Sequence, residues 1–542
     1  MSKAIVYDSE AKQKLLAGIE KLEKAVSATL GPCGKNVIID EYGSIHSTRD
    51  GVTVAKSIDL KDKFENLGAQ AIKEVAEKSG DKVGDGTTTS TVLAASIYKN
   101  GLKYVSLGSN ATQIKNGVRK AADKAIEYVK SVARPIVGKD DIKRVAMVSA
   151  NGDEKIGEII SDVMSKIGND GTVKVENGNG MDMASKVVEG MVIDQSYESP
   201  YMVTNAETME AELDNPWVLV ADKKISNIQE ILPVLQAVTQ TGRPLLVIAE
   251  SYADDVLATL IMNKMRGGLN SVAIKAPSYG DQRRAILDDI AVLCGGKVVT
   301  EATGVRFENA LPGTGVLGSA QRVVSNKSNT VIIGGAGDKA AVEERAGNIR
   351  AQIENSADEF GKTHLQDRLA KLTSGIGVIT VGATTDAERK ELRDRVDDAF
   401  CASKAAVKGG IVAGGGVALL MAKREIESWM PGQDFVGDES VGARIFADSL
   451  EAPIRKIISN AGIDASLIVG KLLDDRSGQN TGYNVLKREF VDMVEDGVID
   501  PADVVVNEIR NSASVAGLLL TTEALVVDEP DEKHHQCCQP AM

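Results

Sequence analysis

The pattern of apolar residues changes twice along the chain, from helical to strand-like and back. These changes restrict the possible architectures more than any single motif does. In the first quarter, apolar residues such as Leu15, Ile19, Leu22 and Val26 recur at helical spacing. Short β-rich runs follow from about residue 135, and strand-like runs alternate with helical ones between about residues 217 and 331. Helical patterns dominate again beyond residue 338. We therefore predict an α/β domain inserted into a helical body that both ends of the chain build.

Composition narrows the classes of function. A chain of 542 residues exceeds one core, so two to four domains are expected. Aromatic residues make up only 4% and the net charge is −14, which argues against nucleic-acid binding. The longest uncharged apolar run, 411–422, is shorter than the roughly 20 residues that a membrane span needs. Since the start of the sequence has no signal-like segment, we expect a cytoplasmic protein.

Cysteine usage favours reduced thiols. The five cysteines are odd in number and widely scattered, so a disulfide framework is not expected. Residues 534–538 (His-His-Gln-Cys-Cys) are able to bind a soft metal, but they belong to a polar terminal tail, where an ordered metal site is rare.

The stretch 84–91 (Gly-Asp-Gly-Thr-Thr-Thr-Ser-Thr) combines a turn with a row of hydroxyls directly before an apolar helical pattern. We expect its threonines to cap the helix and leave backbone N–H groups pointing outward, as an anion site requires. Asp85 could hold magnesium together with phosphate oxygens. On residues alone, a simple capped turn explains the stretch equally well.

A second glycine cluster, 412–419 (Val-Ala-Gly-Gly-Gly-Val-Ala-Leu), opens another helical pattern, which suits a close approach of ligand or backbone. Upstream of it, 395–399 carries Asp397 and Asp398, and a carboxylate there could polarise an attacking water. An exposed acidic face followed by a turn is the competing explanation. The G-x-G-x-x-G match at 313–318 follows Pro312 rather than a strand, so we interpret it as a loop. The sequence contains no P-loop motif.

Taken together, these stretches resemble the group I chaperonins, the GroEL or 60 kDa heat-shock family. Colinear motifs spread over residues 1–520 carry the resemblance, and they are 29–32, 49–55, 84–89, 221–228, 395–399, 412–419 and 514–518. The resemblance implies a multidomain α/β fold. Its parts would be a helical equatorial ATP-binding domain (1–133 and 409–523), a small α/β intermediate hinge domain (134–189 and 376–408), an inserted α/β apical domain (190–375) and a flexible tail (524–542).

The resemblance also implies an ATPase whose hydrolysis drives protein folding, with Mg²⁺ and K⁺ as cofactors. Asp85 would hold the magnesium, while Asp398 and Asp50 would position or activate the water. Gly190 and Gly375 would form the hinge between intermediate and apical domains. The residues implied to surround the nucleotide are Thr29, Leu30, Gly31, Pro32, Arg49, Asp85, Gly86, Thr87, Thr88, Thr89, Gly415, Asn484, Val485, Leu486 and Asp500.

The partners implied are a heptameric ring, stacked as a double-ring 14-mer, a GroES-type lid and unfolded client proteins. The residues themselves also favour an exposed apolar interaction surface, because the patterns near 228–240 and 254–266 carry more apolar residues than one buried stripe needs. Full burial between sheet and neighbour is the alternative for each helix. The client and lid positions implied by likeness are Tyr197, Tyr201, Met202, Leu232, Leu235, Leu257, Ile261 and Met262.

Some positions depart from the family pattern. Cys33 replaces a basic residue next to the pocket, and Arg49 replaces a lysine. Gln195, opposite Asp386, replaces an arginine that pairs with an acid on a neighbouring subunit, which puts ring cooperativity in doubt. The Gly-Gly-Met tail is absent. Two rival classes stay open: a small-molecule phosphate-transfer enzyme, and a scaffold that binds nucleotide without hydrolysing it.

Overall fold

A computed structural model describes residues 2–41, 44–83, 85–168, 171–178, 181–206, 208–355, 359–373, 375–474 and 478–528. The chain divides into two compact units, each described by itself. Unit 1 comprises 1–162, 177–183 and 381–542, and unit 2 comprises 163–176 and 184–380. The inserted α/β domain expected from the sequence is therefore confirmed. The predicted intermediate segments are shared between the two units, and their existence as a third domain stays a prediction.

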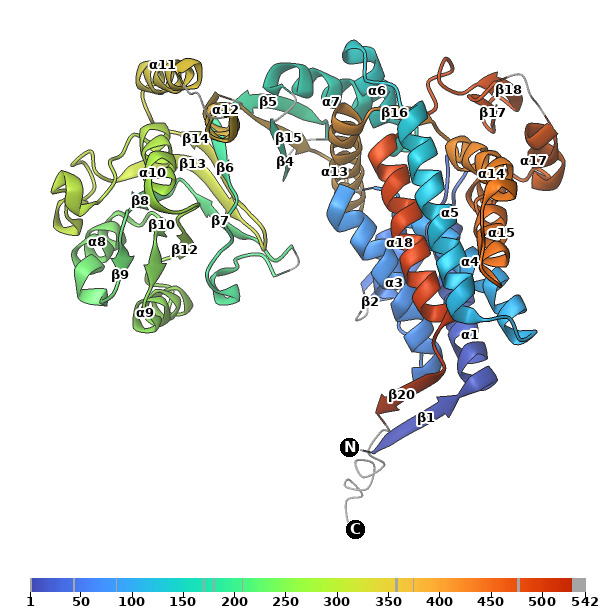
Figure 1. Cartoon of the computed structure of the whole chain (residues 1–542). Helices are drawn as coiled ribbons and strands as arrows, with labels where there is room; N and C mark the ends of the chain where they lie inside the picture. Colours follow the sequence, from blue (N-terminus) through green and yellow to red (C-terminus); the bar gives the residue numbers. More distant parts are fainter. Residues whose placement is uncertain are drawn as a thin grey trace, which may run out of the picture. The chain divides into compact units, whose positions relative to one another are not determined.

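Unit 1 is a helical body in which α18 lies alongside α4 and α5 (Figure 1). Its helices are α1 (Asp8–Ser27), α2 (Gly51–Ser57), α3 (Lys63–Val83), α4 (Thr87–Ser106), α5 (Ala111–Val132), α6 (Gly138–Ser149), α13 (Asp386–Gly409), α14 (Val417–Trp429), α15 (Glu439–Ser449), α16 (Ala452–Asn460), α17 (Ala465–Asp474) and α18 (Ala502–Leu520). Helix α7 (Glu154–Ile167) runs across the division between the units. The predicted apolar stripe of α1 (Leu15, Ile19, Leu22 and Val26) is fully buried in the core of unit 1, because its 3.6-residue spacing keeps these side chains on one face.

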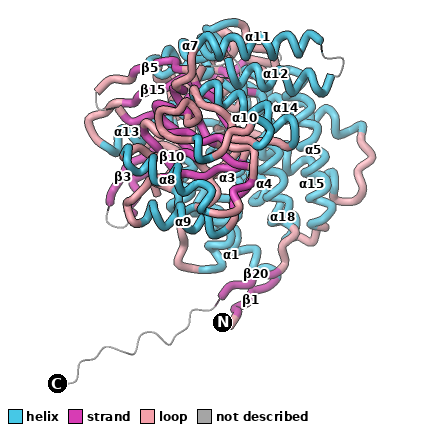
Figure 2. The backbone as a smooth tube through the Cα atoms, turned by 90° about the vertical axis from the view of Figure 1, so that its left-hand side faces the viewer, coloured by secondary structure: helices cyan, strands magenta, loops and turns pink. Residues whose placement is uncertain are grey.

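Short antiparallel pairs complete unit 1. They are β1 (Lys3–Tyr7) with β20 (Ala524–Asp528), β2 (Val37–Glu41) with β3 (Ser44–Thr48), β16 (Ile411–Ala413) with β19 (Ile499–Pro501), and β17 (Thr481–Asn484) with β18 (Glu489–Asp492). The ribbon of β1 and β20 extends away from the helices (Figure 2). The expectation of a flexible tail from 524 onward is thus wrong for 524–528, because these residues make backbone hydrogen bonds with β1. The rest of the predicted tail, with its His/Cys stretch, lies outside the described residues.

Unit 2 is built on a mixed sheet whose described strands run in the order β12-β10-β8-β13-β14-β6, with β7 also paired to β13. The neighbours β8, β10 and β12 are parallel, and β13 is antiparallel to β8 and β14. All five residues of β10 are buried, as expected for a parallel strand covered on both faces. A smaller sheet has the order β4-β15-β5.

The strands of unit 2 are β4 (Thr172–Asn177), β5 (Ala184–Val188), β6 (Gly190–Ile193), β7 (Ala211–Asp214), β8 (Trp217–Val220), β9 (Lys224–Ile225), β10 (Leu245–Ala249), β11 (Ser251–Tyr252), β12 (Ser271–Lys275), β13 (Gly318–Ser325), β14 (Thr330–Gly335) and β15 (Ile376–Val381). Its helices are α8 (Ile228–Thr241), α9 (Asp254–Met265), α10 (Gly280–Cys294), α11 (Lys339–Asn355) and α12 (Glu359–Thr373). The glycine-rich segment 313–317 is a loop before β13, as predicted. No helix among the described residues is long and apolar enough to cross a membrane.

Candidate functional site

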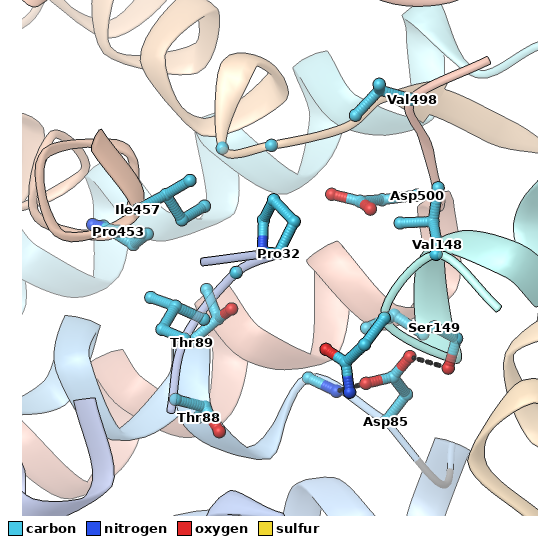
Figure 3. A pocket seen from close by; sticks show the side chains of 18 of the residues that line it. Pro32, Asp85, Thr88, Thr89, Val148, Ser149, Pro453, Ile457, Val498 and Asp500 are labelled. Atoms are coloured by element: carbon cyan, nitrogen blue, oxygen red, sulfur yellow. Dashed lines mark hydrogen bonds between the residues drawn. The ribbon is translucent and has the colours of Figure 1, made fainter. Parts of the chain in front are cut away.

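Unit 1 contains a cavity of about 690 Å³ where segments from distant parts of the chain meet. Every residue that the sequence analysis assigned to nucleotide binding or hydrolysis lines it, including Asp50 and Asp398. The lining comes from the end of α1, the β3–α2 and α3–α4 connections, α13, the start of α14 and the segment around β17–β19. One part of the wall is apolar (Pro453, Ile457 and Val498), whereas Asp85 and Ser149 form a polar part (Figure 3).

The start of α4 presents free backbone donors to this cavity. Gly86 is the N-cap residue with a left-handed φ of 78°, and no side chain caps the helix. The expectation that the threonines cap the helix is therefore wrong, because Thr87, Thr88 and Thr89 form its first turn. Since the first N–H groups of a helix lack intrahelical acceptors, this arrangement leaves an anion site facing the cavity.

The second glycine cluster also opens a helix, as predicted. Gly416 is the N-cap of α14 with φ 82°, and Gly415 has φ 65°. A Cβ on Gly416 would lie only 3.0–3.2 Å from atoms of Ile454. Both the left-handed backbone and the close packing against Ile454 require glycine at position 416. The backbone N–H of Gly415 donates to the carboxyl of Asp500, which joins this turn to β19.

Two hydrogen bonds hold the Asp85 carboxylate in place at the cavity wall. The Ser149 hydroxyl donates to Asp85 Oδ2 at 2.8 Å, as Figure 3 shows, and the Gly86 backbone N–H donates to Asp85 Oδ1 at 2.6 Å. Burial nevertheless raises the pKa of Asp85, and the nearby charge of Asp50 adds to this rise. A half-buried carboxylate with this cost of ionisation is a natural partner for a cation.

The predicted catalytic carboxyls differ in their surroundings. Asp50 caps α2, since its oxygens accept from the backbone N–H groups of Val52 (3.1 Å) and Thr53 (2.8 Å). Asp398 lies on α13, and burial raises its pKa well above the ordinary value, with further increments from Asp85 and Asp50. Of these two carboxyls, Asp398 has the environment that suits a proton acceptor, because desolvation raises the basicity of its carboxylate.

Three functional candidates were missed by the sequence analysis: Ser149, Asp394 and Glu508. Asp394 precedes Asp398 by one helical turn, and burial together with Asp50 raises its pKa to about 6. Glu508 is a buried charged residue on α18, and burial followed by the charges of Asp500 and Asp85 raises its pKa. The i, i+4 spacing of Asp394 and Asp398 indicated that both lie on one face of α13, but the sequence offered no comparable signal for Ser149 or Glu508.

The cavity as a whole is short of positive charge. The described lining residues include nine carboxyl groups but only four cationic side chains. The carboxyl groups are those of Asp50, Asp85, Asp140, Glu391, Asp394, Asp398, Asp496, Asp500 and Glu508. The cationic side chains are those of Arg49, Lys143, Arg144 and Arg395. Lys143 is also paired with Glu154 (3.0 Å) and Glu158 (2.9 Å). A polyphosphate entering this cavity would therefore need a metal cation. No described set of three or more acidic, histidine or cysteine side chains forms a metal cage.

Asn484 shapes the base of the cavity. Its side-chain oxygen accepts from the backbone N–H groups of Leu486 (2.9 Å) and Lys487 (3.2 Å), and its amide donates to Asp496 Oδ2 at 2.5 Å. Val485 belongs to the adjoining apolar cluster with Ile454 and Met493. These contacts hold the 484–487 turn in place beside the apolar wall.

The residues implied to bind clients are only partly available. Leu232, Leu257 and Ile261 are half-buried, while Tyr201 (70%), Met262 (45%) and the neighbouring Met265 (70%) are exposed. Tyr197, Met202 and Leu235 are buried in the core of unit 2, so the structure corrects their assignment to a contact surface. They face inward because α8 and the 197–202 segment pack onto the sheet, as the bridge between Tyr197 and Ile274 illustrates.

The predicted hinge glycines lie at the same end of the antiparallel β5–β15 pair, where Val188 pairs with Ile376. A Cβ on Gly190 would come within 2.4 Å of Ile332 O and Ile376 Cδ1, and one on Gly375 within 2.6 Å of Val187 Cγ1. Neither glycine has a left-handed φ. Close packing therefore explains glycine at both positions, and their role as a hinge stays a prediction. The described cysteines Cys33, Cys294 and Cys401 are free thiols, as expected.

Comparisons with known proteins agree with this arrangement. A sequence model described as the TCP-1/cpn60 chaperonin family matches residues 22–530. A solved structure similar to this chain is the chaperonin gp146 from the bacteriophage EL 2 (Pseudomonas aeruginosa), crystallised in the presence of ATP-BeFx. It shares 22% identity with a TM-score of 0.67, and the match covers 97% of this chain and 99% of that one. This likeness shows that the chain has a chaperonin fold.

Proposed function

The chain belongs to the TCP-1/cpn60 chaperonin family, and we propose that it is an ATPase that captures non-native polypeptides and uses ATP binding and hydrolysis to promote their folding. The family and the fold support a protein-folding function. The observation that carries the ATP-dependent part is the 690 Å³ cavity of unit 1, which all the implied nucleotide residues line together with the uncapped start of α4. The complex of the phage chaperonin with ATP-BeFx supports it as well.

In this proposal, different groups of the chain bind the phosphates, hold the metal, activate the water and contact the base. The first N–H groups of α4, including that of Thr89, and the hydroxyls of Thr87 and Thr88 bind the triphosphate. Asp85 holds Mg²⁺, which neutralises phosphate charge, and K⁺ is a further cation suggested by the family likeness. Asp398 orients the attacking water and accepts its proton, which a buried carboxylate of raised pKa does efficiently. The apolar wall around Ile454, Ile457 and Val498 receives the base.

We place client binding on the exposed and half-buried apolar side chains of α8, α9 and the 200–202 turn. This surface, the α8–α9 surface, consists of Tyr201, Leu232, Leu257, Ile261, Met262 and Met265. Non-directional apolar contact tolerates many sequences, and the unbranched methionines adapt to different partners. The same surface would take an amphipathic segment of a GroES-type lid.

We propose a heptameric ring, paired back to back, as the working assembly. Two described ribbons of unit 1, β1–β20 and β2–β3, have no further strand beside them and carry exposed large apolar side chains. These side chains are Ile5 (44%), Tyr7 (57%), Val526 (52%), Ile38 (73%) and Ile45 (73%). A two-stranded ribbon of this kind is marginal alone, and its open edges suit pairing with a second copy.

Two measurements test the proposal. Phosphate release from Mg-ATP, with and without a denatured client, separates a chaperonin from its rivals. A nucleotide-binding scaffold releases no phosphate, and a metabolite enzyme shows saturable acceleration by a small molecule but none by unfolded protein. Native mass measurement across salt and nucleotide conditions tests the ring, and a chain that stays monomeric or dimeric throughout contradicts it.

A further inference from the structure

Glu508 is buried at the cavity wall although nothing in the proposed reaction uses it so far. It lies on α18, only 6% exposed, and lines the cavity between the phosphate-binding start of α4 and Asp500. Its helix neighbours Val504, Val505 and Ile509 are all buried apolar residues. A carboxyl beside these apolar side chains and near the carboxyls of Asp500 and Asp85 is costly to bury, so its contacts need a reason.

Those contacts are with the turn that opens α4. The Thr89 hydroxyl hydrogen-bonds the Glu508 carboxyl. Glu508 Oε1 lies 2.7 Å from where a Cβ on Gly86 would be, and Glu508 Cγ lies 3.0 Å from it. The side chain of Glu508 thus fills the space behind the left-handed Gly86 and holds Thr89 at the same time.

We propose that Glu508 is a positioning residue for ATP hydrolysis, which fixes Thr89 and the Gly86 turn so that the first backbone N–H groups of α4 have the geometry that receives the triphosphate. The proposal rests on the proposed ATPase function and assigns a role within it. A free threonine hydroxyl samples several rotamers, and a hydrogen bond to a buried acceptor selects one before the nucleotide arrives. Such preorganisation lowers the barrier, because no rearrangement is needed when charge develops on the phosphate.

A second contact between the same helices provides a matched control. The Ser512 hydroxyl, one turn further along α18, donates to the Ser90 carbonyl at 2.9 Å and is fully buried. Ser512 does not line the cavity. Removing its hydrogen bond loosens the packing of α18 on α4 without touching Thr89.

The test compares steady-state ATP hydrolysis of Glu508→Met, Glu508→Gln and Ser512→Ala in the full-length protein. Glu508→Met keeps the volume but removes the acceptor, and kcat should fall about tenfold while the KM changes less than threefold. Glu508→Gln retains an acceptor oxygen and should recover most of this loss. Ser512→Ala should hydrolyse ATP at the wild-type rate, even if its unfolding midpoint drops.

A double-mutant cycle with Thr89→Val decides whether Glu508 acts through Thr89. In the Thr89→Val background, Glu508→Met should change kcat less than twofold. Fully additive losses would overturn the inference, as would a Glu508→Gln variant as slow as Glu508→Met. An active wild type that is unaffected by Glu508→Met would overturn this inference alone. A wild type for which calorimetry detects no nucleotide binding would overturn the proposed ATPase as well.

Discussion

In the cavity of unit 1, the groups that would face a ligand are held in place by other parts of the chain. Asp50 is tied to the backbone of α2, Asp85 to Ser149, and Asn484 to Asp496. On the α8–α9 surface of unit 2, Tyr201 and the exposed methionines lie at the rim of a buried core and make few fixed polar contacts. The cavity is built to recognise one charged ligand at defined points, whereas the apolar surface places no directional demand on its partner.

The two regions also lower the stability of the folded chain in different ways. Burying carboxyl groups such as Asp394 and Asp500 raises their pKa values to about 6 and about 7, so their ionised forms oppose folding until a cation binds. Exposing Tyr201 and Met265 costs lost apolar burial and creates a surface able to associate. Both costs are expected where stability is given up for binding.

The largest expected effect separates the carboxyls of the cavity. Asp398→Ala should lower the rate of ATP hydrolysis by about 10²–10⁴, the usual loss for a positioned acid–base group, and leave ATP affinity nearly unchanged. Asp85→Ala should weaken affinity and turnover together, because it removes the proposed metal ligand. Phosphate release and calorimetric binding measure the two quantities. Equal losses of affinity and rate in both variants would show that the residues share one role.

The next effect tests the boundary between core and surface in unit 2. Leu235 is 5% exposed, so Leu235→Ala should lower the free energy of unfolding by about 2–5 kcal/mol. Met262→Ser, at a 45% exposed position, should leave the unfolding midpoint almost unchanged and weaken capture of a denatured client. Chemical unfolding and suppression of client aggregation provide the readouts. Normal capture by a doubled variant, Tyr201→Ser with Met262→Ser, would remove this surface from client binding.

A smaller effect concerns pH. Burial and Asp50 raise the Asp394 pKa to about 6 from an unfolded value of about 3.9, so the folded chain binds the proton more tightly. The resulting stabilisation is complete below about pH 4 and is lost as the pH rises through about 6. The neighbouring groups that set this value are Asp50, Asp397, Lys390 and Arg393.

Asp394→Asn should therefore be more stable than the wild type at pH 7.5, by up to about 3 kcal/mol, and this advantage should shrink toward pH 5. Denaturant unfolding at both pH values measures it. The matched control is Asp123→Asn, which makes the same substitution at an exposed position of α5. An advantage for Asp394→Asn that is the same at both pH values would contradict the explanation by proton binding.

The smallest effect concerns the cap of α2. Asp50→Ala removes the acceptor for the Val52 and Thr53 backbone N–H groups, which should cost about 1 kcal/mol of stability. Asp50→Ser retains an acceptor and should recover part of that stability. If Asp50 also acts on the water, its hydrolysis rate stays low in the serine variant, so unfolding and phosphate release together separate capping from chemistry.

The sequence by itself determined much of this protein. The 3.6-residue spacing on α1 fixed its buried face, the glycines at 414–416 required a tight turn into α14, and colinear motifs indicated the chaperonin fold. These features are local, or are local signals repeated in a fixed order along the chain. The resemblance carried by these motifs implied that residues from 29 to 500 would lie together, and the structure places them around one cavity.

Only the tertiary structure decided which polar and apolar side chains face a ligand. Asp394, Ser149 and Glu508 join the cavity because α13, α6 and α18 bring them there, and no short-range pattern reports such a meeting. Leu235 and Leu232 look alike in the sequence, yet the first packs on the sheet and the second stays half-buried, because a helix with apolar residues on most of its circumference has no unique inward face until its neighbours are placed. Burial and the pKa values it sets depend on every group nearby, and folding alone fixes them.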